Sequence, residues 1–127
     1  MKLKKMEFTV AHMKKGAAPA IRVTKGGVFS FNKGLSEHLK LNAGTGVDFF
    51  QDEEVPRDWY IKLSEKSQNK VRRKEPSKGY LFNNAGLAGA FLTSIDAIDD
   101  SKSFKVATVP EKVGKEFYYA ILIGLPE

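Results

Sequence analysis

The chain has 127 residues, of which 42% are hydrophobic and 28% charged; this is the composition of a globular protein and the length of one compact domain. It contains no cysteine, which excludes disulfides and thiolate chemistry and fits a reducing cytoplasm. The formal net charge of +6 favours an anionic partner such as nucleic acid or a membrane surface, and charge and pattern together favour nucleic acid. No apolar run approaches the roughly 20 residues that span a bilayer.

Residues 1–19 are predicted to form an N-terminal arm with one short strand. Glu7–Val10 alternates apolar and polar side chains, and Gly16 and Pro19 then break the pattern. No apolar segment follows the basic Met1–Lys5, so no signal peptide is expected. The lysines of this arm either contact phosphates or belong to a solvated chain end.

Residues 20–67 are predicted to form a ββαββ unit that begins with a hairpin. Ala20–Lys25 alternates in the manner of a strand, with Ile21 and Val23 on one face. The Gly26-Gly27 pair favours a tight turn, because glycine adopts positive φ without steric cost. Val28–Phe31 is expected to return as the second strand.

A short helix and two more strands complete this unit. Asn32 is a good N-cap, since its side-chain oxygen can accept a backbone N–H, and Leu35 and Leu39 share one helical face. Strands are expected from Val47 and over Trp59–Leu63, with Trp59, Ile61 and Leu63 facing the core.

Residues 68–127 are predicted to repeat the same elements in the same order, which indicates an internal duplication. The expected elements are a strand at Val71–Lys74, a turn with Pro76 and Gly79, a strand at Tyr80–Asn83, a helix at Ala85–Ile95, a strand from Phe104 to Thr108 and a strand at Glu116–Ile121. The last strand is apolar on both faces and is expected to be central or well covered. Coincidence between two β-rich halves is the alternative.

Within Thr24–Leu63, Gly27 is followed by an apolar strand, by leucines in a short helix, and by Gly44 and Val47 in a Gly-x-x-Val turn. In this order of features the stretch resembles the SpoVT/AbrB swapped-hairpin DNA-binding family, which includes MazE-like and MraZ-like proteins. The resemblance implies an α+β, mostly β fold in which two ββαββ repeats interlock into one AbrB-like barrel. One chain would then act as a monomeric pseudo-dimer, with a further homodimer as an additional expectation.

Basic residues cluster at corresponding places of the two units and are expected to contact nucleic acid. The expected contact residues are Arg22, Lys25, Lys33, Arg72, Arg73, Lys74 and Lys78. Two such clusters in a pseudo-dimer would lie on related faces and could straddle a duplex. The alternative is a solvated strand face. The resemblance favours duplex DNA and a transcriptional regulator of bacterial or phage type.

Two other functions stay open at this point. Tyr60 and Tyr118 lie off the expected core face and could stack on single-stranded bases. A protein-interaction or assembly module that kept the fold without DNA binding is the other alternative. His12 and His38 are far apart, and the acidic runs lack the ligand spacing of a calcium loop, so we expect no metal, no cofactor and no enzymatic activity.

Overall fold

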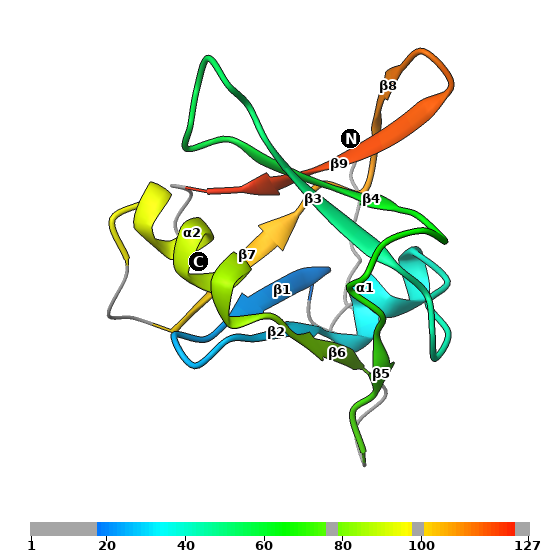
Figure 1. The fold of residues 1–127 in the computed structure, drawn as a ribbon. Helices are drawn as coiled ribbons and strands as arrows, with labels where there is room; N and C mark the ends of the chain where they lie inside the picture. Colours follow the sequence, from blue (N-terminus) through cyan, green and yellow to red (C-terminus); the bar gives the residue numbers. More distant parts are fainter. Residues whose placement is uncertain (1–17, 76–78, 98–100, 124–127) are drawn as a thin grey trace, which may run out of the picture.

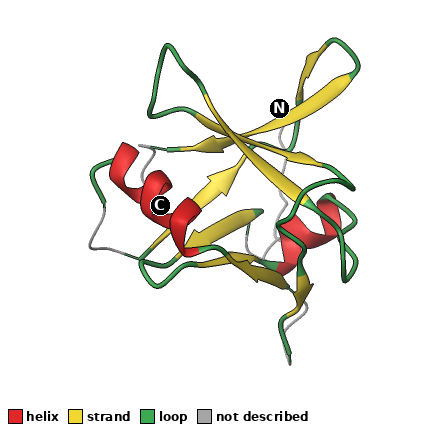
Figure 2. Ribbon diagram, in the orientation of Figure 1, coloured by secondary structure: helices red, strands yellow, loops and turns green. Residues whose placement is uncertain are grey.

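The computed structural model describes residues 18–75, 79–97 and 101–123, which form a mostly β structure with two helices (Figures 1 and 2). The elements in chain order are β1 (Ala20–Val23), β2 (Val28–Phe31), α1 (Lys33–His38), β3 (Val47–Gln51), β4 (Trp59–Leu63), β5 (Arg72–Arg73), β6 (Tyr80–Asn83), α2 (Ala85–Ser94), β7 (Lys102–Val106), β8 (Glu111–Val113) and β9 (Glu116–Leu122). The strand expected at Glu7–Val10 lies outside the described residues.

The strands pair into one antiparallel sheet in the order β3-β4-β9-β7-β1-β2-β6-β5, and β8 adds to β9. The sheet curls into a half-barrel, so that it forms two layers that face each other in Figure 1. Layer A consists of β7, β1, β2, β6 and β5, and layer B consists of β3, β4, β9 and β8. The pairing of β7 with β9 connects the two layers.

The two ends of this strand order also meet, through residues that precede β3 and β5. Gly46 and Lys70 form an isolated antiparallel bridge. The backbone N–H of Val71 donates to Thr45 O at 2.9 Å, and that of Gly44 donates to Val71 O at 2.7 Å. Layers A and B are therefore hydrogen-bonded along both sides of the half-barrel.

The helices start where capping chemistry predicts. Asn32 Oδ1 accepts the backbone N–H of Leu35 at 2.8 Å, and Asn84 Oδ1 accepts that of Leu87 at 3.0 Å. The prediction for Asn32 is confirmed, and α2 ends one residue before the expected Ile95. The two helices lie at opposite ends of the half-barrel (Figure 2).

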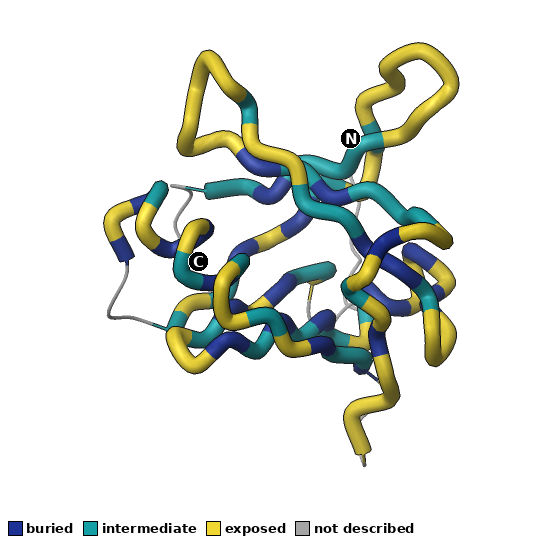
Figure 3. The backbone as a smooth tube through the Cα atoms, viewed as in Figure 1, coloured by how far each residue is buried: buried dark blue, intermediate teal, exposed yellow. Residues whose placement is uncertain are grey.

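Aromatic side chains fill the space between the layers. The rings of Phe29 and Phe82, which are partners across β2 and β6, stack with centroids 4.8 Å apart. Phe49 of β3 reaches both rings from layer B, at 4.9 and 5.9 Å. Trp59 packs on Phe91 of α2 at 5.1 Å. Buried segments accordingly line the inner side of both layers in Figure 3, which confirms the expected core positions.

The C-terminal hairpin departs from the prediction. Strand β9 does lie between β4 and β7, as expected. Its first residues, however, pair with β8, an unpredicted strand, and Phe117 is half exposed. The first two residues of β9 are exposed, because the β8–β9 hairpin extends beyond the edge of the half-barrel (Figure 1).

Candidate nucleic-acid interface

The outer side of layer A follows from the alternation of side chains along a β-strand. On β1, Ile21 and Val23 are fully buried, whereas Arg22 between them is exposed. Residues opposite each other on neighbouring strands point to the same side of a sheet, so the register extends this outward position into a row. The row contains Ser103 of β7, Arg22 of β1, Ser30 of β2, Leu81 of β6 and Arg72 of β5.

Two arginines therefore stand on one surface with two uncharged strands between them. Arg22 and Arg72 are three strand spacings apart, which is about 14 Å along the sheet. Lys105 adds a third outward cation, since it is the register partner of Ala20 at the start of β1. Within the bounds of the five strands of layer A there is no aspartate and no glutamate. Positive charge on this side is thus not neutralised by the layer itself.

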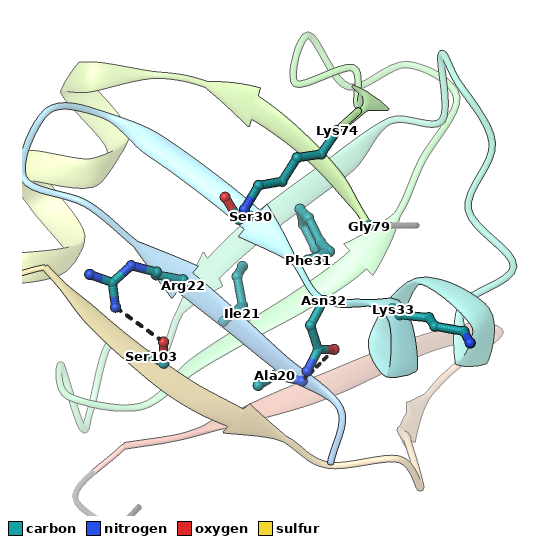
Figure 4. A pocket seen from close by; sticks show the side chains of 10 residues that line it. All are labelled: Ala20, Ile21, Arg22, Ser30, Phe31, Asn32, Lys33, Lys74, Gly79 and Ser103. Atoms are coloured by element: carbon teal, nitrogen blue, oxygen red, sulfur yellow. Dashed lines mark hydrogen bonds between the residues drawn. The ribbon is translucent and has the colours of Figure 1, made fainter. Parts of the chain in front are cut away.

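A cavity of about 340 Å³ opens on the same surface and brings predicted residues of both units together. Arg22, Lys33 and Lys74 all line it, as Figure 4 shows. The Arg22 guanidinium donates a hydrogen bond of 3.4 Å to Ser103 Oγ, and Lys74 extends toward Ser30. Lys33 projects outward from the start of α1. We call the surface formed by Arg22, Lys33, Arg72, Lys74 and Lys105 the basic face.

Asn32 lines this cavity and joins two of the elements around it. Its Oδ1 accepts the backbone N–H groups of Ala20 and Leu35, at 3.1 and 2.8 Å. Its Nδ2 donates to Ala18 O at 2.8 Å. One side chain therefore ties the start of β1 to the start of α1, which sets the position of Lys33 relative to the strands.

The other predicted basic residues contribute less to this surface. Lys25 is exposed in the β1–β2 turn. Arg73 is the neighbour of Arg72 on β5, so the two side chains alternate to opposite sides of the sheet. The Nε of Arg73 lies 3.7 Å from a Glu75 carboxylate oxygen, and its guanidinium lies 5.8 Å from the centre of the Tyr80 ring. Lys78 lies outside the described residues. Sequence reasoning missed Lys105, although its place between Phe104 and Val106 indicates an outward side chain.

Tyr60 and Tyr118 lie on layer B and share a different cavity, which Asp52 and Glu111 also line. Burial raises the pKa of Tyr60, and the neighbouring carboxylates of Glu111, Asp58 and Asp52 raise it further. Negative charge at this place repels phosphate groups. The surroundings of the two tyrosines therefore disfavour the stacking of single-stranded nucleic acid there.

Comparison with known proteins adds no relative: no protein-family model, no curated protein and no solved structure matches this chain. Across the described residues, no group of three or more histidine, aspartate or glutamate side chains is placed to hold a metal ion. None of the helices in the described part of the chain is long and apolar enough to cross a membrane.

Proposed function

We propose that this protein binds duplex DNA through the basic face. The observation that carries the proposal is the row across layer A, in which Arg22 and Arg72 flank two uncharged strands and no strand contributes an acidic residue. Arginine is suited to this task because its planar guanidinium can donate two parallel hydrogen bonds to one phosphate. Such contacts supply most of the affinity of proteins for the DNA backbone.

The dimensions of the sheet decide which part of the duplex it contacts. A major groove about 12 Å wide admits one helix or a two-stranded ribbon, but not a layer of five strands. The layer must therefore lie across the groove. With about 14 Å between them along the sheet, Arg22 and Arg72 would reach phosphates on its two sides. Ser30 and Leu81 between them would face the groove.

The register supports the further proposal that the chain is an internally duplicated, AbrB-like pseudo-dimer. Arg22 pairs with Ser30 in the first hairpin, Arg72 pairs with Leu81 in the second, and Ser30 pairs with Leu81. The two arginines are thus equivalent about a twofold axis between Ser30 and Leu81. Exchange of the two units replaces β1 with β5, β2 with β6, β3 with β7 and β4 with β9, and the reverse. This exchange leaves the strand orders β1-β2-β6-β5 and β3-β4-β9-β7 unchanged, apart from the direction in which they are written.

The contacts that join these two groups of four strands obey the same relation. Ile21 of β1 pairs with Phe104 of β7, and their equivalents under the exchange are Val71 and Thr45. Those two residues are joined by the hydrogen bond from Val71 N to Thr45 O. A protein with twofold symmetry matches a palindromic DNA site. We therefore propose a cytoplasmic regulator, without enzymatic activity, that binds a near-palindromic operator as one chain.

Salt dependence of DNA affinity tests this proposal. Five phosphate contacts should give a slope of log affinity against log salt of about −4.5, measured with a short duplex between roughly 50 and 200 mM salt. The double variant Arg22→Gln, Arg72→Gln should reduce the magnitude of that slope by about 2.

The matched control removes the same charge from layer B. Lys112→Gln with Lys115→Gln changes two exposed cations of the β8–β9 hairpin and should leave the slope as it is. An equal loss in both double variants would mean that only net charge matters. A wild-type chain that prefers single strands, or that binds neither form at low salt, would refute the proposal.

A further inference from the structure

The outer side of layer B holds a second cavity, of about 260 Å³. The register explains why its residues converge. Phe50 and Tyr60 are partners across β3 and β4, and Glu111 and Tyr118 are partners across β8 and β9. Tyr60 also faces Ala120, two residues from Tyr118, so the two pairs lie on the same side of the sheet.

Aromatic rings form much of the cavity wall. The rings of Phe50 and Tyr118 meet edge to face, with centroids 5.2 Å apart and planes at 82°. Tyr60 lines the same space. The face of an aromatic ring carries partial negative charge and attracts cations within about 6 Å.

Charge in the cavity has the sign opposite to that of the whole chain. Asp52 and Glu111 line it, and no lysine or arginine does. Oδ1 of Asp52 accepts the backbone N–H groups of Glu54 and Val55, at 2.8 and 3.2 Å, which holds the carboxylate in place. The raised pKa of Tyr60, caused by burial and then by Glu111, Asp58 and Asp52, is a sign of the same negative field. Tyr60 therefore stays neutral in a site that favours a cation.

Two exposed apolar side chains, Phe50 and Val113, line this cavity. Among the described residues, the exposed large hydrophobic side chains all come from β3, the β3–β4 loop or the segment from β7 to β9, and they are 38% to 79% exposed. They are Phe50, Val55, Val109, Val113 and Phe117. A hydrophobic rim around a small charged cavity is typical of a surface for a protein partner rather than for a nucleic acid.

We infer that this cavity binds an arginine or lysine side chain of a partner protein, flanked by apolar residues that contact the rim. The aromatic walls and the two carboxylates provide the cation site, and the exposed Val113 provides the apolar contact. The cavity lies on layer B, whereas the basic face lies on layer A. The protein can thus hold a partner while layer A is on DNA, and the inference does not depend on DNA binding.

The test uses a capped tripeptide, acetyl-Leu-Arg-Leu-amide, titrated into ¹⁵N-labelled protein without DNA. Saturable amide shifts are expected at Tyr60, Glu111 and Tyr118. The citrulline analogue, which has the shape of arginine but no charge, should bind about tenfold more weakly. Asp52→Asn with Glu111→Gln should cause a similar loss, while Asp48→Asn with Glu65→Gln removes equal charge outside the cavity and should change nothing.

Three outcomes would overturn the inference. One is an equal response to the arginine and citrulline peptides. Another is an equal loss in the cavity variant and its control. The third is the absence of saturable shifts around Tyr60 and Tyr118. Spectra of the free variants show whether each remains folded, and Glu111→Gln alone can replace the double variant, because no hydrogen bond or ion pair holds its carboxylate within the described structure.

Discussion

The two layers of the half-barrel are alike on their inner sides, which are apolar, and differ on their outer sides, which carry different charges. Inward positions of both are apolar and buried, such as Phe31 in layer A and Ile61 in layer B. The outer side of layer A carries arginine and lysine, and the strands of this layer contain no acidic residue. On layer B, Lys62 is paired with Glu116 at 3.2 Å, and Glu111 borders an aromatic cavity.

This difference separates the positions that determine folding from the positions that point to function. Inner positions are constrained by packing, and an apolar side chain there says little about activity. Outer positions of a strand are free of that constraint, so a consistent choice of charge on one layer points to what the layer contacts. The basic face and the aromatic cavity therefore point to two kinds of partner, an anionic one on layer A and a cationic one on layer B.

The largest expected effect comes from breaking the aromatic contact between the layers. Phe82 is buried and its ring contacts both Phe29 and Phe49. Phe82→Ala should lower the free energy of unfolding by about 3–5 kcal/mol in a denaturant titration. Phe117→Ala is the matched control, since its half-exposed side chain on the hairpin should cost within about 0.5 kcal/mol. Similar losses would mean that the hairpin is part of the stabilising core.

A smaller effect is expected where the layers meet at their end strands. A Cβ on Gly46 would lie 2.1 Å from Ser64 O, so the backbone has to move to accept any side chain. Gly46→Ala should therefore destabilise the fold by about 1–3 kcal/mol. Gly89→Ala in α2 meets no atom within 4 Å and should stabilise the fold by about 0.5–1 kcal/mol. A neutral result at Gly46 in thermal unfolding would contradict the close approach.

The smallest expected effect concerns how the free energy of unfolding falls at alkaline pH. Burial, with Glu111, Asp58 and Asp52, raises the pKa of Tyr60 above its ordinary value of about 10. The folded state then holds this proton more tightly than the unfolded chain, so the contribution to stability is complete below about pH 10 and is lost as the pH rises through the folded pKa. Tyr60→Phe should flatten the alkaline fall in unfolding free energy, and an unchanged slope would contradict it.

Local patterns were enough to predict much of layer A. The alternation around Ile21 and Val23, the glycine turn at Gly27 and the cap at Asn32 each depend on a few neighbouring residues, and the structure has all three. Gly27 does adopt positive φ, at 105°. The exposed state of Arg22 followed from the same alternation.

What sequence reasoning missed depends on contacts between distant strands. Lys105 joins the basic face only because β7 pairs with β1, and no local pattern states that pairing. The cavity of Tyr60 and Tyr118 needs the unpredicted β8 to bring Glu111 beside Tyr118. Arg73 shares the sequence cluster of Arg72 but has the opposite parity, and Glu75 lies next to it.

The decisive measurement is the change in the amide spectrum of the ¹⁵N-labelled protein on addition of a short DNA duplex, because it reports on both layers in one experiment. DNA binding through the basic face predicts shifts at low salt that centre on Arg22, Ser30, Leu81 and Arg72 and that fade as salt is raised. It predicts little change at Tyr60 and Tyr118. Shifts centred on the β3–β4 and β8–β9 hairpins, or no shifts at low salt, would contradict the assignment of layer A to DNA.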